Sequence, residues 1–144
     1  MAFLTCLSRL LRRRKPLSLI INADAINEQK PEGFVDTSRG RVTWKTLISA
    51  PKTATDTFSV GIATCPPKTG QLCRHRHKQA EVYHITEGIG IIQIDGIEKE
   101  VRTGHVIYIP GNAKHGIRNE DPELDLVWLY VFAVDAFEDV KYRF

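Results

Sequence analysis

Residues 70–88 read GQLCRHRHKQAEVYHITEG and residues 104–119 read GHVIYIPGNAKHGIRN, and these two stretches decide the fold. Both contain apolar residues in alternation with polar ones, as half-buried strands do, and both carry histidines. His75 and His77 are two residues apart, so we expect their side chains on one face of a strand, about 6.6 Å apart at the backbone. Two imidazoles at that spacing can reach a single metal ion.

A carboxylate and a third histidine complete a candidate metal site. Glu81 begins the next predicted strand, Tyr83 shares its face, and His115 follows the turn at Pro110-Gly111. We predict four ligands of one divalent metal ion: His75, His77, Glu81 and His115. Four ligands leave two positions of an octahedral ion open for substrate or water, and open positions are typical of catalytic sites.

The rest of the chain reads as an all-β domain of antiparallel strands. Apolar or alternating runs recur every 8–12 residues between turn residues, which is typical of a sandwich or barrel. The runs cover 42–49, 58–65, 80–86, 89–95, 98–102, 105–110, 115–119 and 124–134. Asp95-Gly96, between two alternating runs, predicts a hairpin. We also expect a short strand at 17–21 and a short helix at 134–140.

The N-terminal residues differ in charge from the rest of the chain. The net charge of the 144 residues is +3, yet residues 1–16 hold five basic residues and no acidic one, so the remainder is mildly acidic. A mildly acidic body gives no reason to expect nucleic-acid binding. We therefore predict a flexible basic tail at 1–16 and a single domain at 17–144, which is an ordinary length for one domain.

The tail also bears on location. Its longest apolar run is too short to cross a bilayer, so we predict no integral membrane span. Cys6, Cys65 and Cys73 show no paired spacing, which indicates reduced thiols and favours a cytoplasmic protein. An Arg-rich, acid-free segment is also compatible with a mitochondrial presequence, and that alternative remains open.

The two opening stretches together resemble the two motifs of the cupin family. The first contains HxHxxxE followed by six residues and a glycine. The second contains glycine, five residues, proline, four residues, histidine, three residues and asparagine. One departure is that four residues, where five are usual, separate Gly70 from His75. The resemblance implies a double-stranded β-helix, a jelly-roll barrel with its ligand cavity inside.

On that model Tyr83 faces the pocket, and we predict it as a catalytic residue. Trp128, Tyr130 and Phe132 share one face of the last long strand, so they could frame an aromatic substrate. Cys73 shares the predicted face of the two motif histidines, and we expect it as buried packing. His84 and His105, on the face opposite to Glu81, are expected either at the surface or as neighbours of the metal ligands.

Three functions remain open, since the cupin fold hosts many reactions. The chain as a whole resembles small cupins described as oxidoreductases, some in fungal polyketide clusters. We therefore predict a metal-dependent, dioxygenase-like oxidoreductase that acts on a small organic, aromatic or polyketide-derived substrate in secondary metabolism. The pattern HxHxxxExY also resembles cupin-type dimethylsulfoniopropionate lyases, in which Tyr83 would be the base. The third reading is a non-catalytic cupin that binds a small ligand.

The cofactor and partner expectations follow from the same site. Three imidazoles and one carboxylate suit several first-row ions, and Fe(II) is our first choice, with Mn, Ni, Cu or Zn as alternatives. The expected partner is a small-molecule substrate. A homodimer is expected from the family resemblance alone.

Overall fold

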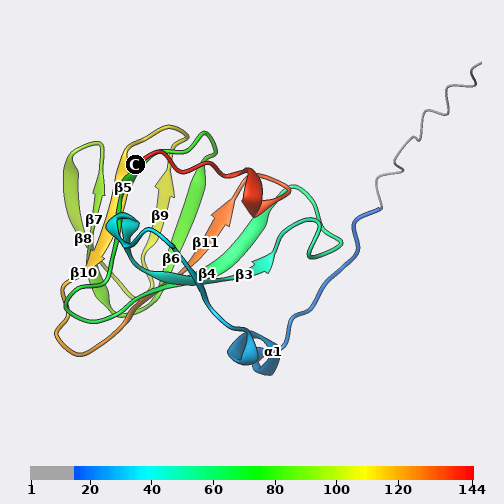
Figure 1. Cartoon of the computed structure of the whole chain (residues 1–144), viewed down its shortest axis with the longest axis horizontal. Coiled ribbons are helices and arrows are strands. Elements are labelled where there is room, and N and C mark those ends of the chain that lie inside the picture. The colour runs from blue at the N-terminus through cyan, green and yellow to red at the C-terminus, as the bar shows by residue number, and fades with distance from the viewer. Residues whose placement is uncertain (1–14) are drawn as a thin grey trace, which may run out of the picture.

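The computed structural model describes residues 15–144, and most of their regular structure is strand (Figure 1). The strands are β1 (Glu32–Gly33), β2 (Gly40–Arg41), β3 (Thr43–Ile48), β4 (Ser59–Cys65), β5 (Gln71–His75), β6 (Glu81–Glu87), β7 (Ile89–Ile94), β8 (Ile97–Arg102), β9 (Val106–Ile109), β10 (His115–Asn119) and β11 (Leu126–Phe132). The helical segments are α1 (Ala23–Glu28) and two 3-10 turns, η1 (Thr37–Arg39) and η2 (Phe137–Asp139).

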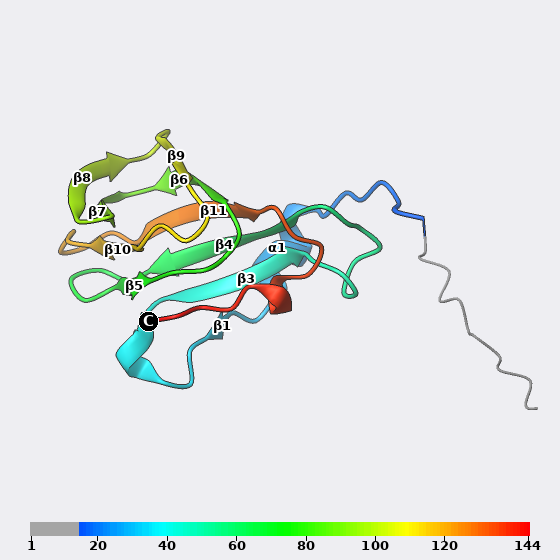
Figure 2. The same ribbon diagram turned by 90° about the horizontal axis from the view of Figure 1, so that it is seen from above.

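The strands form two antiparallel sheets that wrap around a shared interior, as Figure 2 shows from above. One sheet has the order β1-β3-β4-β11-β6-β9, and the other has the order β2-β5-β10-β7-β8. Apolar residues of both sheets meet in one core, among them Ile85 and Trp128 from the first sheet and Ile92 and Ile117 from the second. The predicted all-β, jelly-roll barrel is therefore confirmed.

The alternating runs form strands close to where the sequence placed them. In β11 every second side chain is buried, because residues of an extended strand point alternately to the two faces of a sheet. The predicted hairpin is also confirmed: Ile94 pairs with Ile97 across Asp95-Gly96. Both turn residues have positive φ angles, 46° and 88°, as a two-residue hairpin turn of this kind requires.

The predicted strand at 17–21 is wrong. Leu17–Ile21 forms no strand. Its backbone is held to the domain by a hydrogen bond of 2.9 Å, which the Leu17 N–H donates to the Ala54 carbonyl. A short helix, α1, follows instead, because the Asn22 side chain accepts a hydrogen bond from the Ala25 amide and so caps the first turn. The predicted helix at 134–140 is limited to the single turn η2.

The helix α1 lies outside the barrel, beside β3 (Figures 1 and 2). The Lys45 ammonium of β3 donates to the carbonyls of Ile26 and Asn27, at 2.8 and 3.1 Å, and so holds the end of the helix. Among residues 15–144 no helix is both long enough and apolar enough to cross a membrane.

Candidate metal centre

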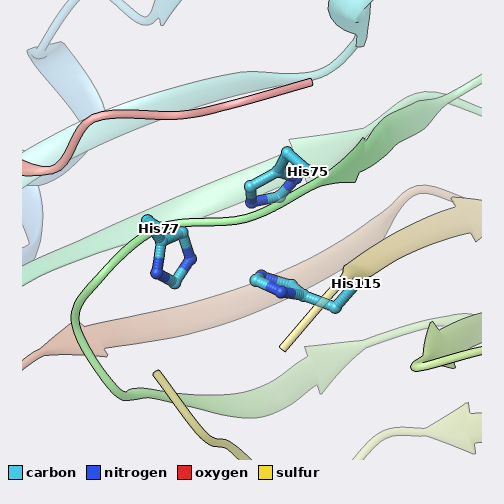
Figure 3. A group of neighbouring side chains, drawn as sticks. All are labelled: His75, His77 and His115. Atoms are coloured by element: carbon cyan, nitrogen blue, oxygen red, sulfur yellow. The ribbon is translucent and has the colours of Figure 1, made fainter. Parts of the chain in front are cut away.

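Three buried histidines converge in the barrel interior, as Figure 3 shows. His75 ends β5, His77 lies two residues beyond it, and His115 begins β10. One ligand nitrogen from each lies within 4.8 Å of the others. The rings are fully buried, with centroids 4.3 Å apart for His75 and His115 and 4.8 Å apart for His77 and His115.

The hydrogen bonds of the rings determine which nitrogen carries the proton. The Nδ1 atoms of His75, His77 and His115 lie 2.8, 2.9 and 2.9 Å from the backbone carbonyls of Cys73, Gln79 and Ala113. A carbonyl only accepts, so each Nδ1 must carry the hydrogen, and in the neutral ring Nε2 is then a free acceptor. Within residues 15–144 these three Nε2 atoms have no hydrogen-bond partner. This is the protonation pattern that metal-binding histidines need.

A buried carboxylate completes the cluster. Glu81 begins β6, in the sheet opposite to β5 and β10, and its Oε2 atom lies 3.2 Å from Nε2 of His77 and 3.3 Å from Nε2 of His115. These neutral nitrogens and the carboxylate oxygen are all acceptors, so their close approach is unfavourable unless a cation or proton lies between them. The four predicted ligands are thus brought together, and the three histidines could hold a metal ion.

The environment keeps His75 neutral. Burial of the ring, together with the neighbouring His115, lowers the pKa of His75 to about 3. A neutral imidazole offers its Nε2 lone pair to a metal at pH 7 without first losing a proton.

A β-bulge aims His75 into the barrel. His75 pairs with His115 but Leu72 pairs with Ile117, so β5 takes one more residue than β10 over the same length. The bulge turns both Leu72 and His75 inward. The bulge requires glycine at position 116, because a Cβ there would lie 2.8 Å from the Leu72 carbonyl oxygen, which is too close for a side chain.

The bulge also corrects the prediction for Cys73. This residue does not share the inward face of His75; it is only partly buried, and its thiol donates to the Ser38 carbonyl at 3.4 Å. His84 is exposed on the outer face of β6, as predicted.

Tyr83 lies beside the cluster, as the strand alternation predicted. It is almost fully buried next to Glu81, and its ring lies 5.4 Å from that of Trp128 and 6.4 Å from that of His115. Burial and the negative charge of the neighbouring Glu81 hold the pKa of Tyr83 well above its usual value. A cation on the cluster would oppose the effect of Glu81.

A cavity of about 520 Å³ opens beside Glu81 and Tyr83. Its volume is in the range of small-molecule sites. Much of its wall is aromatic, and the aromatic residues that line it are Phe34, Trp44, Tyr83, Trp128, Tyr130, Phe137 and Tyr142. Trp128 and Tyr130 stand there as the aromatic face of β11 predicted, whereas Phe132 packs against His77, with ring centroids 5.0 Å apart.

Four aromatic residues of the cavity wall were not predicted from the sequence: Trp44, which lies on β3, and three residues from irregular segments. Phe34 comes from the loop after β1, Phe137 from η2 and Tyr142 from the chain end beyond it. Irregular segments have no periodicity from which a facing side can be read, so only their aromatic composition could have drawn attention to them.

Comparison with known proteins identifies the family. Residues 61–132 match the model of the cupin domain. The dimethylsulfoniopropionate lyase DddW of Ruegeria pomeroyi is 43% identical over 112 residues, which are 78% of this chain and 72% of that protein.

Solved structures agree on the fold. The polyketide cyclase RemF of Streptomyces resistomycificus superposes with a TM-score of 0.70 and 21% identity, over 88% of this chain and 84% of that one. A cupin-2 domain protein of Rhodospirillum rubrum superposes with a TM-score of 0.67 and 21% identity, over 92% of this chain and 83% of that one. The family match covers half of the chain, the strands form the two expected sheets, and the motif histidines lie in one cluster. This chain therefore belongs to the cupin family.

Proposed function

We propose that this protein is a metal-dependent lyase that releases dimethyl sulfide from dimethylsulfoniopropionate. The observation that carries the proposal is the 43% identity with a lyase of that name over 78% of this chain. This was the alternative, and not the first choice, of the sequence analysis. The aromatic cavity beside the histidine cluster supports it independently.

The first part of the proposal concerns the metal. His75, His77, Glu81 and His115 would hold one divalent ion, because their acceptor atoms lie close together and none of them has a hydrogen-bond donor as partner within the described residues. Fe(II) remains our first choice and Mn, Ni, Cu or Zn the alternatives, since this donor set selects poorly among first-row ions. When bound, the ion would act as a Lewis acid that draws electron density from a carboxylate and so acidifies the adjacent C–H bond.

The second part concerns the base. Tyr83 lines the cavity next to Glu81, within reach of a substrate held there. As phenolate it would take the proton from the carbon next to the carboxylate, and the electrons of that C–H bond would form the C=C bond of acrylate. The C–S bond breaks in the same elimination, and its electron pair leaves with dimethyl sulfide. The cation near Glu81 would favour the phenolate that this step requires.

The third part concerns the sulfonium group. Dimethylsulfoniopropionate carries a positive charge on a sulfur that has no hydrogen to donate, so ring faces and negative charges are its natural contacts. Trp44, Tyr130 and Phe137 line the cavity away from the histidines, with ring centroids 6.3 Å apart for Trp44 and Phe137 and 5.5 Å for Tyr130 and Phe137. The acidic residues Glu32, Asp36 and Glu138 also line it, together with one basic residue, Arg39, which forms an ion pair with Asp36 at 3.5 Å. The wall thus suits a small organic cation.

The competing functions receive less support. The oxidoreductase prediction is not confirmed, because the polyketide cyclase is only 21% identical and therefore establishes the fold alone. A binding module without chemistry would not need the four converging donor atoms beside a buried tyrosine.

The test is the release of dimethyl sulfide by purified protein loaded in turn with Fe(II), Mn, Ni, Cu and Zn. We expect release with at least one ion and a fall in kcat of roughly 10² to 10⁴ in Tyr83→Phe, since removal of a general base has that effect. Tyr108→Phe is the matched control, because Tyr108 is an exposed tyrosine on β9. Absence of dimethyl sulfide from every metal-loaded form, or full activity in Tyr83→Phe, would contradict the proposal.

A further inference from the structure

The chain end forms a strap over the metal-ligand strand. We call Val140–Phe144 the C-terminal strap; in Figure 3 the chain end is the red segment that passes the histidines. Arg143 in the strap pairs with Arg76 through two backbone hydrogen bonds, both 2.9 Å long. Arg76 lies between His75 and His77, so the strap is bound directly to the segment that carries two of the predicted ligands.

Side chains fix the strap a second time. The Arg143 guanidinium donates to Oδ1 of Asn112 at 2.7 Å, and the Arg76 guanidinium donates to the Asn112 carbonyl at 3.1 Å. The backbone N–H of Asn112 in turn donates to the backbone carbonyl of His77 at 2.7 Å. The strap is thus joined to both motif stretches, close to His77 and to the turn that precedes His115.

This attachment places Tyr142 in the cavity. Neighbouring residues of an extended segment point to opposite sides, so Tyr142 points inward while Arg143 points toward Asn112. The Tyr142 ring lies 4.6 Å from the His75 ring and 5.6 Å from the His77 ring, and it stacks on Phe144 at 6.0 Å.

The Tyr142 phenol lies near the reacting groups. Tyr142 lines the same cavity as Glu81 and Tyr83. A phenol carries one O–H donor. Tyr142 therefore offers a hydrogen-bond donor beside the predicted base.

We propose that Tyr142 is a substrate-binding residue, whose phenol donates a hydrogen bond to the carboxylate of the substrate and whose position is set by the C-terminal strap. The proposal rests on the proposed function in its choice of a carboxylate substrate. A carboxylate only accepts hydrogen bonds, and the aromatic wall farther from the histidines is left for the cationic end of the molecule. In this arrangement Tyr83 removes the proton and Tyr142 orients the group next to it.

The decisive variant is Tyr142→Phe, which keeps the ring against His75 and removes only the hydroxyl. A hydrogen bond to a charged group has an effect of roughly tenfold to a hundredfold on affinity. We expect KM for dimethylsulfoniopropionate to rise by that factor, with kcat within threefold of wild type and an unchanged metal content. Tyr108→Phe, on the outer face, is the control and should leave all three values unchanged.

A binding measurement keeps this test separate from the lyase assay. Calorimetric titration of the metal-loaded protein with propionate measures carboxylate recognition without any elimination. We expect Tyr142→Phe to weaken propionate binding by at least fivefold, whether or not wild-type protein releases dimethyl sulfide. Wild-type propionate binding in Tyr142→Phe, or a loss of metal and kcat at unchanged KM, would show that Tyr142 only packs against the site and would overturn the proposal.

A second pair of variants tests the strap. Arg143→Pro removes the amide that donates to the Arg76 carbonyl, whereas Arg143→Ala keeps that amide. We expect Arg143→Pro to weaken propionate binding as much as Tyr142→Ala does, and Arg143→Ala to weaken it less. Equal propionate affinities in Arg143→Pro and wild type would show that the strap does not position Tyr142.

Discussion

The barrel strands and the segments that cover the cavity contribute to the same site in different ways. The strands β5, β6 and β10 carry His75, Glu81 and His115, and ladders of backbone bonds on both sides hold them in register. The covering segments, 34–39 and 137–144, carry Phe34, Phe137 and Tyr142. They contact one another through aromatic rings, and backbone hydrogen bonds between Arg143 and Arg76 join the second segment to the barrel. The strands thus hold the candidate metal centre, and the covering segments line the cavity beside it.

This difference bears on how cupins differ from one another. Proteins only 21% identical to this chain share its barrel. Loops and chain ends vary more readily than ladder strands, because fewer backbone hydrogen bonds depend on them. Changes of the strand residues that point into the histidine cluster should therefore abolish the reaction, and changes in the covering segments should alter the choice of substrate.

The largest effect is expected from a ligand. His77→Ala should remove metal from the purified protein and lower dimethyl sulfide release about 10³-fold, because the charge that develops on the carboxylate is no longer stabilised. Metal analysis and headspace gas chromatography measure the two quantities. His84→Ala changes an exposed histidine and is the control; normal metal content in His77→Ala would remove this residue from the ligand set.

The next largest effect is expected on the stability of the barrel, from a change of Asn119. The buried Asn119 amide donates to the carbonyls of Cys65, Pro66 and Leu124, at 3.0, 3.2 and 2.8 Å. Asn119→Ala leaves these carbonyls without that donor and should lower the free energy of unfolding by about 3 kcal/mol in urea titrations. Activity of the folded fraction at low temperature should stay within threefold, since Asn119 does not line the cavity. An unchanged unfolding curve would contradict this structural role.

A smaller effect is expected from a covering segment. Phe137→Leu keeps an apolar side chain at η2 but removes a ring face from the cavity wall. We expect KM for dimethylsulfoniopropionate to rise roughly fivefold to thirtyfold with kcat nearly unchanged, the size of a desolvated cation–π contact. Steady-state kinetics with full metal loading provide the measurement. A fall in kcat at constant KM would place Phe137 with the chemistry rather than with substrate choice.

The smallest effect concerns a strand residue that points away from the site. Cys73→Ser keeps a hydroxyl where the thiol meets the Ser38 carbonyl, so activity and metal content should stay within twofold of wild type. Metal loss in this variant would mean that the bulge in β5 depends on the thiol. Together the four variants test whether a residue's effect on activity depends on whether its side chain points into the site. The alternative is that the effect depends on whether the residue belongs to one of the two sequence motifs.

Much of the barrel could be predicted because strand signals are local. The alternation of β11 and the Asp95-Gly96 turn between β7 and β8 can be read within a few residues. The strand predicted at 17–21 failed for the opposite reason: its apolar run has no neighbouring strand to pair with, and Asn22 starts a helix next to it. Local pattern indicates that a segment can form a strand, but not whether a partner exists.

The sequence by itself determined the all-β class and predicted which four residues form the candidate metal centre, because the motif residues and the two-residue period are visible without knowing any contact. Only the tertiary structure decided how these residues meet. It brought Glu81 from one sheet against His77 and His115 and inserted the bulge that turns His75 inward and Cys73 away. It also carried Tyr142 from the chain end to the histidines. Each of these depends on contacts between residues distant in the chain, and no local pattern encodes them.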